Sequence, residues 1–294
     1  MKGSAGALAS VIAAVAVGAL VALAGSDGGA TAAGLPVMVW CAVAAYGVNW
    51  IAYVPSMLMR TERFFDLTGT ITYITVLAVA LVTVARYDGR SVLLAALVSI
   101  WSIRLGTFLA RRIIAAGSDS RFDSIKTDPL RLLSTWTLQG LWVLLTMAAA
   151  LAAITADREA AFDWGVPVGA AIWAVGFSLE VVADRQKQEF RSDPANDGRF
   201  IRTGLWAWSR HPNYFGEILL WTGIAVISVG ALGGWAHLTL VSPLFVYVLL
   251  TRISGVPLLE RSGQKRWGED PEYRRYVADT PSLFPRPPHK APQR

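Results

Sequence analysis

The sequence has one cysteine and three histidines, too few for the metal sites that these side chains usually build. Cys41 is the single thiol, so no disulfide can form within the chain. His211, His237 and His289 are scattered, and no two have the spacing of metal ligands on a helix. We therefore expect no bound metal and no redox metal chemistry.

Charged residues are also scarce, at 16% of the chain against 54% hydrophobic residues. The glycine-rich loops of soluble nucleotide-binding domains, Gly-x-Gly-x-x-Gly and Gly-x-x-x-x-Gly-Lys-Ser/Thr, are absent. No segment between the apolar runs exceeds about 45 residues, which is too short for an independent soluble domain. Any cofactor must therefore bind between the membrane helices and their loops.

Eight apolar runs are long enough to cross a hydrocarbon core of roughly 30 Å as helices. They lie near residues 6–24, 36–56, 68–85, 92–110, 133–155, 165–183, 214–232 and 235–252. The first run could instead be a signal peptide, but it lacks a convincing cleavage site before Ser26 and another run follows at once. The sequence predicts an all-α, polytopic transmembrane helix bundle of seven or eight spans, with cytoplasmic loops covering a cofactor cavity.

The basic residues indicate the orientation of these spans, because lysine and arginine gather on the cytoplasmic side. With the N-terminus inside, only Arg86, Arg90 and Arg158 of the 27 basic residues lie outside. We therefore expect both termini in the cytoplasm. The net charge of +6 then reflects this bias and does not indicate a nucleic-acid partner.

The richest polar segment, Thr203–Glu217, lies at the start of the seventh apolar run. Polar side chains at the edge of the hydrocarbon region cost several kcal/mol unless they are paired or bind a ligand. Pro212 is well placed to begin a helix, whose N-terminus attracts phosphate or carboxylate groups. A pair between Arg210 and Glu217 would account for Glu217 but not for Asn213. We therefore predict a binding site here.

The neighbouring segments contain charged residues that could belong to the same binding site. Glu180 and Asp184 are four residues apart and share one helix face. Arg185 and Lys187 could neutralise them in a structural network, or the two acids could accept hydrogen bonds from a bound nucleotide. The next segment is turn-rich, and its arginines could wrap a phosphate group or be solvated at an anionic membrane surface: Arg191, Arg199 and Arg202.

The tail after the last apolar run is amphipathic. Arg252 ends that run, and Glu260 and Arg261 follow. The stretch Lys265–Tyr276 mixes basic and aromatic residues, which predicts a helix lying on the membrane surface. Anchoring to the surface would account for Trp267 and for the basic residues.

These motifs resemble those of the bacterial DUF1295 proteins of the steroid 5α-reductase superfamily. The resemblance rests on Gly204–Glu217, Ser242–Phe245, Ser254–Glu260 and Arg266–Tyr273. It extends upstream through Arg104–Leu109, Asp119–Asp123 and Trp136–Gln139, so that it covers nearly the whole chain. A shorter core, Arg-His-Pro-x-Tyr, is shared with isoprenylcysteine carboxyl methyltransferases and sterol reductases.

The resemblance implies a reductase of the bacterial inner membrane. Such an enzyme takes NADPH from the cytoplasm and gives its hydride to an activated carbon–carbon double bond of a lipid from the bilayer, a 3-oxo-Δ4 steroid or a related enone. Residues 1–132 would form transmembrane helices on the substrate side, and residues 133–294 the NADPH-binding region with a cytoplasmic tail.

The resemblance also implies roles for residues at matching positions. Asn213 and Glu217 would contact the nicotinamide end, Asp184 would contact the cofactor with Glu180 one turn earlier, and Arg252 would serve the phosphates. The full set expected to bind the cofactor is Glu180, Asp184, Arg199, Arg210, His211, Asn213, Tyr214, Glu217, Arg252 and Glu260.

Hydride addition to an enone builds negative charge on the carbonyl oxygen, so catalysis needs a hydrogen-bond or proton donor there, a positioned nicotinamide and no water. The acid and the tyrosine that serve the carbonyl in the steroid enzymes have no secure match here. Tyr73 in the third run is the preferred donor, with Asp66 or Tyr53 as substitutes; Tyr73 could also be a packing residue. The catalytic candidates are therefore Tyr73, Asp66 and Glu217.

Two other functions remain open. The Arg-His-Pro core also fits an S-adenosylmethionine-dependent methyltransferase acting on a membrane thiol or carboxylate. The chain could instead be a non-catalytic protein that binds or transports lipids, although it shows no internal repeat of the kind common in transporters. NADPH binding distinguishes the reductase from both alternatives.

Overall fold

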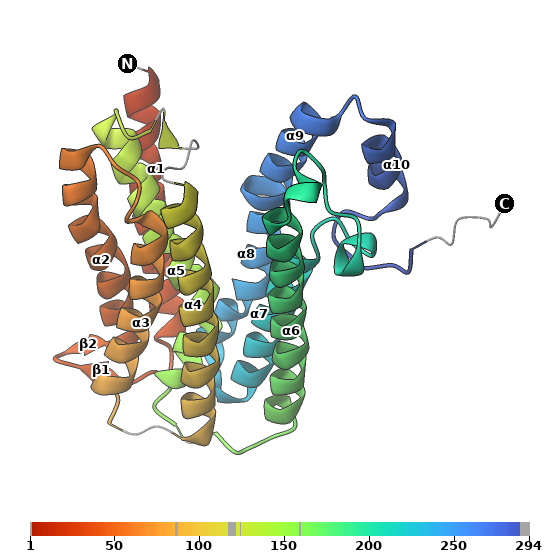
Figure 1. Cartoon of the computed structure of the whole chain (residues 1–294). Coiled ribbons are helices and arrows are strands. Elements are labelled where there is room, and N and C mark those ends of the chain that lie inside the picture. Colours follow the sequence, from red (N-terminus) through yellow and green to blue (C-terminus); the bar gives the residue numbers. More distant parts are fainter. Residues whose placement is uncertain (1, 86–87, 117–121, 124, 159, 289–294) are drawn as a thin grey trace. The chain divides into compact units, whose positions relative to one another are not determined.

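The computed structural model describes residues 2–85, 88–116, 122–123, 125–158 and 160–288 (Figure 1). Arg86, Asp119 and Arg121 lie outside the described residues. The first half contains α1 (Lys2–Gly25), α2 (Val37–Met59), α3 (Phe65–Thr83), α4 (Gly89–Ala116) and α5 (Pro129–Ile154). The second contains α6 (Gly165–Ser192), α7 (Pro212–Ser228), α8 (Ser242–Val248), α9 (Gly255–Trp267) and α10 (Pro271–Asp279). A two-residue strand pair, β1 (Thr31–Ala32) and β2 (Leu35–Pro36), links α1 to α2.

Among the described residues, eight helical segments are long and apolar enough to cross a membrane, and they coincide with the eight predicted runs. The predicted all-α, polytopic membrane fold is therefore confirmed. The last segment, Gly234–Trp267, is not one regular helix. It consists of the 3-10 helix η5 (Gly234–Val241), α8, the π-helical turn η6 (Leu249–Ile253) and α9. Pro257 has no N–H to donate to the carbonyl of residue 253, so a regular α-helix cannot continue through this point.

The helices form two compact units. Unit 1 comprises residues Met1–Pro167 and Ala225–Ser242, and unit 2 comprises Val168–Ile224 and Pro243–Arg294. In unit 1, α5 contacts α1, α2, α3, α4 and η5. Every residue of α5 from 143 to 154 is buried, as expected of a helix surrounded by others. The predicted division into a substrate side, residues 1–132, and an NADPH-binding region, residues 133–294, concerns ligand binding and not packing. It stays a prediction.

Two of the basic residues that the sequence assigned to the outer side hold loops of unit 1 together. Arg90 is 2% exposed and pairs with Asp163 at 2.9 Å, and it also donates to the carbonyl of Ala161. This contact with the guanidinium lowers the pKa of the Asp163 carboxyl. Arg158 donates to the carbonyls of Ala231 and Leu232. Arg90 and Arg158 therefore have structural partners of their own.

In unit 2, α6 and α7 touch through their backbones at glycines. A Cβ atom on Gly216 would lie 2.6 Å from the carbonyl oxygen of Gly176 and 2.7 Å from the nitrogen of Glu180. Two turns further along α7, a Cβ on Gly223 would lie 2.5 Å from the carbonyl oxygen of Gly169. Small residues allow this close approach of membrane helices. The contact sets Glu180 against the first turns of α7.

We predict that Gly216→Ala lowers the free energy of unfolding by about 1–3 kcal/mol, because its methyl group would force α6 and α7 apart. Gly47→Ala in α2 is the matched control, since a Cβ there has no neighbour within 4 Å. Thermal unfolding of the two variants in detergent measures the difference. Equal midpoints would show that α6 and α7 do not need this contact.

Candidate functional site

The segment before α7 is held against α6 by Trp206. This indole is 3% exposed and donates to the carbonyl of Ala183 at 3.0 Å. Beside it, the N–H of Leu205 donates to the side chain of Gln186 at 2.9 Å. Gly204 enters this turn with φ of +61°, a conformation that favours glycine. Pro212 then begins α7, as the sequence predicts.

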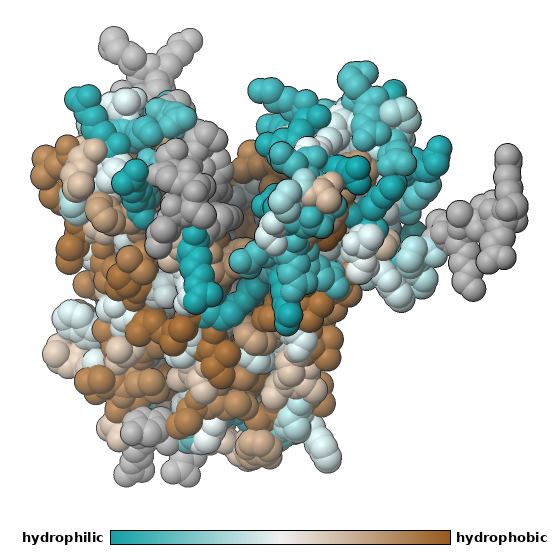
Figure 2. All heavy atoms as spheres, viewed as in Figure 1, coloured by the Kyte–Doolittle hydropathy of each residue, from teal (hydrophilic) through white to brown (hydrophobic). Residues whose placement is uncertain are grey.

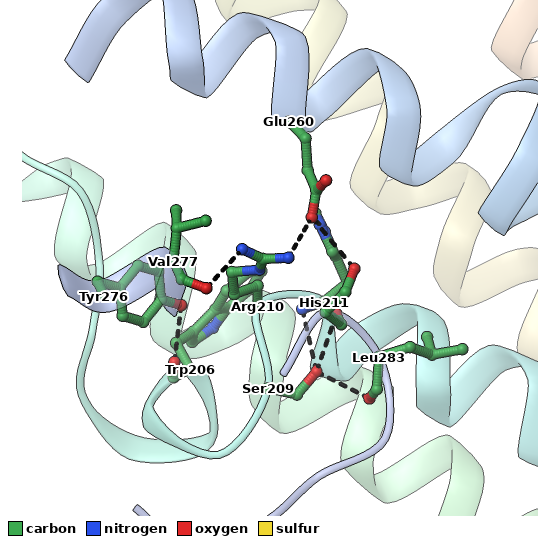
Figure 3. A network of polar contacts seen from close by, with 9 residues as sticks. Trp206, Ser209, Arg210, His211, Glu260, Tyr276, Val277 and Leu283 are labelled. Atoms are coloured by element: carbon green, nitrogen blue, oxygen red, sulfur yellow. Dashed lines mark hydrogen bonds and ion pairs between the residues drawn. The ribbon is translucent and has the colours of Figure 1, made fainter. Parts of the chain in front are cut away.

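The chain after α10, residues 280–286, crosses the same segment, and we call it the C-terminal strap. The hydroxyl of Ser209 is within hydrogen-bonding distance of the carbonyls of Leu283, at 2.8 Å, and Ser282, at 3.3 Å, and it accepts from the N–H of His211 (Figure 3). The N–H of Arg210 donates to the carbonyl of Pro281. These bonds fix the backbone of Arg210 and His211. The strap therefore holds in place the residues that precede α7.

A cavity of about 410 Å³ lies within unit 2. It is lined by the end of α6, the loop around residue 200, the segment before α7, and helices α9 and α10. Figure 2 shows hydrophilic residues gathered over α9, α10 and the end of α6. Among the described residues that line the cavity, Glu260 is the single acid, and the basic ones are Lys187, Arg191, Arg199, Arg210, Arg261 and Arg266. The cavity therefore suits an anionic ligand.

His211 lines this cavity and is 5% exposed. Its ring stacks on Tyr214, with centroids 5.7 Å apart. Neither ring nitrogen forms a hydrogen bond with any described residue, and Nε2 lies 3.6 Å from a carboxylate oxygen of Glu260. Burial, together with the positive charges of Lys187 and Arg210, lowers the pKa of His211 to about 3. The imidazole is therefore neutral at pH 7, and its buried ring nitrogens provide one donor and one acceptor without hydrogen-bond partners among the described residues.

An acid and an amide connect α6 to the start of α7. The amide nitrogen of Asn213 donates to a carboxylate oxygen of Asp184 at 3.1 Å. The amide oxygen of Asn213 is buried and accepts no hydrogen bond from the described residues. Glu180, 3% exposed, lies one turn before Asp184. Arg185, which the sequence offered as a neutralising partner, forms its ion pair with Glu189 at 2.7 Å.

The structure brings several predicted site residues together in unit 2. Those lining the cavity are Arg199, Arg210, His211 and Glu260. Asp184 and Asn213 form the pair just described, with Glu180 and Glu217 on the same two helices, and Tyr214 packs on His211. Arg252 is exposed in η6 and does not line the cavity.

The residues proposed to serve the substrate carbonyl lie in unit 1. Asp66 is in the first turn of α3, and Tyr73 is buried in the same helix with its ring 5.2 Å from that of Trp101. The hydroxyl of Tyr53 is 3.2 Å from the carbonyl of Pro129. The catalytic roles of Tyr73, Asp66 and Glu217 stay predictions, as do the cofactor contacts.

The prediction of a single helix over Lys265–Tyr276 was wrong, whereas its place on the membrane surface stays a prediction. The structure ends α9 at Trp267 and begins α10 at Pro271, where the side chain of Asp270 caps the new helix. Trp267 donates to the carbonyl of Gly198 at 2.5 Å, and Phe200 packs against Trp267, Tyr273 and Tyr276. These aromatic residues fold α9 and α10 over the loop that carries Arg199, a role that anchoring to a membrane surface does not describe.

Comparisons with known proteins give one family match. The family described as "Protein of unknown function (DUF1295)" matches residues 52–280. The chain is 29% identical over 122 residues to the "Probable O-methyltransferase ustE" of Ustilaginoidea virens, covering 42% of this chain and 41% of that protein. It is 31% identical over 68 residues to the "3-oxo-5-alpha-steroid 4-dehydrogenase 1" of Bos taurus, covering 23% and 26%. The matches thus span less than half of either relative, and no solved structure matches significantly.

We predict that His211 makes stability depend on pH. Its pKa is lowered from 6.5 to about 3 in the folded chain, so its contribution to stability is present above pH 6.5 and is lost as the pH falls toward 3. Thermal unfolding of wild type and His211→Gln is compared from about pH 7.5 to about pH 5. Wild type should lose stability relative to the variant as the pH falls. Parallel curves would contradict a buried neutral imidazole.

Proposed function

The chain belongs to the DUF1295 family, and we propose that it is a membrane-embedded, NADPH-dependent reductase of an activated carbon–carbon double bond in a lipid. Its weak similarity to a steroid 4-dehydrogenase is consistent with the steroid 5α-reductase superfamily. The observation that carries the proposal is the cavity in unit 2, whose lining sets six basic side chains against one carboxylate beside the buried, neutral His211.

Charge favours a dinucleotide in this cavity. NADPH carries about four negative charges on its phosphates, and arginine and lysine are the side chains that bind phosphate best. S-adenosylmethionine carries a sulfonium and an ammonium against one carboxylate. Six cations in the lining repel such a ligand, whereas they attract a polyphosphate. The lining therefore supports NADPH over S-adenosylmethionine.

The start of α7 offers groups for the uncharged end of the cofactor. His211 lines the cavity, and Asn213 follows two residues later on the same chain. The unsatisfied amide oxygen of Asn213 can accept a hydrogen bond from a carboxamide, and Asp184 holds the Asn213 side chain in place. A buried acceptor without a partner costs stability unless a ligand supplies a donor. This cost supports a ligand amide or hydroxyl at Asn213.

NADPH, when bound, supplies the hydride in the proposed reaction. The chain's basic residues would hold the phosphates, and Asn213 and Asp184 would orient the nicotinamide end, with Glu217 one turn further along α7. Addition of the hydride to the β-carbon of an enone leaves the negative charge on the carbonyl oxygen, which takes a proton. We propose Tyr73, with Asp66 as the substitute, as the donor of that proton.

A methyltransferase is the second candidate. The similarity to the O-methyltransferase covers 41% of that protein, whereas the similarity to the dehydrogenase covers 26%. The methyl donor would need a site that accepts a cation, and the described cavity has one carboxylate for that purpose, Glu260. A non-catalytic lipid-binding or transport protein is the third candidate, and it predicts no turnover with any enone.

We predict that NADPH raises the unfolding temperature of the purified protein in detergent with a saturable dependence on concentration, and that S-adenosylmethionine does not. Asn213→Ala should weaken NADPH binding about 10-fold to 100-fold, because it removes the acceptor and frees Asp184. Asn196→Ala is the control, since the amide of Asn196 donates to Phe190 and Asp193 near the end of α6 rather than to Asp184. Stabilisation by S-adenosylmethionine and not by NADPH would contradict the reductase function and support the methyltransferase function.

We also predict slow oxidation of NADPH when a 3-oxo-Δ4 steroid such as testosterone is added in detergent, followed by absorbance and by mass analysis of the reduced steroid. Tyr73→Phe should lower the rate about 100-fold or more while leaving NADPH binding unchanged, because it removes the proposed proton donor. Tyr247→Phe serves as the control tyrosine. Full activity of Tyr73→Phe would exclude this role for Tyr73.

A further inference from the structure

Glu260 differs in charge from the other ionisable groups around the cavity. It is the single acidic residue among the described residues of the lining, and it lies on α9 facing six basic side chains. Its side chain is 40% exposed, so it is within reach of a ligand entering from solvent. A carboxylate in this position repels an anion and is therefore unexpected in a site for phosphates.

The contacts of Glu260 gather on one oxygen. Oε1 accepts from Nη2 of Arg210 at 2.8 Å and from the hydroxyl of Ser282 in the C-terminal strap at 3.1 Å (Figure 3). Nε2 of His211 is 3.6 Å from the same oxygen. Arg210 is 15% exposed, so this ion pair is shielded from water on the arginine side. Glu260 is thus held at the point where Arg210 faces the cavity.

Two of the five N–H groups of the Arg210 guanidinium have partners among the described residues. Nη1 donates to the carbonyl of Val277 at 3.0 Å, and Nη2 is paired with Glu260. Nε is buried and forms no hydrogen bond with the described residues. A phosphate binds arginine best through two parallel N–H groups, and Glu260 covers one side of that fork. The ion pair and a bound phosphate therefore compete for the same guanidinium.

We propose that Glu260 is an internal counter-ion that an anionic ligand displaces from Arg210, and that it thereby sets how tightly the cavity binds polyphosphates. The proposal rests on the proposed function only in taking the ligand to be anionic. Without the ligand, the carboxylate neutralises Arg210 and ties α9 to the C-terminal strap through Ser282. With the ligand, the phosphate takes over Nη2, and Glu260 turns toward solvent.

The test compares wild type with Glu260→Gln, using NADPH and inorganic pyrophosphate as probes in detergent. The glutamine keeps the size of the side chain, and its amide oxygen can still accept from Arg210 and Ser282, but it carries no charge. We expect both probes to bind about tenfold more tightly, with the gain shrinking as salt is added. Glu260→Ala is tested alongside, so that the result does not depend on one variant folding.

Glu189→Gln is the matched control, because Glu189 pairs with Arg185 on the exposed face of α6 and does not line the cavity. Its affinity for both probes should equal that of wild type. Unchanged or weaker binding of both probes by the two Glu260 variants would overturn the proposal. S-adenosylmethionine is a third probe: if it binds wild type and not Glu260→Gln, the proposal is overturned too, because Glu260 would then be a ligand for a cation.

The two proposals fail separately. If pyrophosphate binds more tightly to Glu260→Gln while NADPH binds to neither protein, the counter-ion role stands and the reductase does not. If NADPH binds equally to wild type and to both Glu260 variants, NADPH remains the proposed cofactor and the counter-ion role of Glu260 is excluded. Absence of binding of either probe to any variant overturns both.

Discussion

The backbone contact between α6 and α7 is the constraint on which the site depends. At Gly176 and Gly216 the two helices lie closer than any side chain would allow, which brings the acidic end of α6 beside the first turns of α7. At this separation the amide of Asn213 donates to Asp184. In a membrane, where lipid tails compete equally for apolar surface, close packing of this kind is a main source of helix association.

On this base the cavity is built from parts that are distant in sequence. Trp206 fixes the segment before α7 to α6, while the C-terminal strap fixes Ser209 and Arg210. The aromatic residues of α9 and α10 close over the loop around Phe200. The strap contacts satisfy backbone groups outside the regular helices. Together, all of these contacts hold several cations near one another. Mutual repulsion makes such a cluster unfavourable unless an anion, internal or bound, is present.

The sequence predicted the parts of this structure that depend on local patterns. Apolar runs located the eight spans, and Pro212 located the start of α7. The break before Pro271 also has a local signal, because Asp-Pro favours the start of a helix, but the amphipathic pattern of the tail runs through it and favours one helix. The ion pair between Arg210 and Glu260 was not readable. It joins residues fifty positions apart in sequence, and their charges matched several other partners equally well.

The C-terminal strap has a consequence for how the protein is made. A ribosome synthesises residues 280–286 after every predicted span, so insertion into the membrane can be far advanced before Ser209 and Arg210 meet their carbonyl partners in the strap. Until then the segment before α7 has its polar groups exposed, and the arginine lacks the contacts that aim it. The conformation of the segment before α7 therefore depends on contacts that form only after the last predicted span has been synthesised.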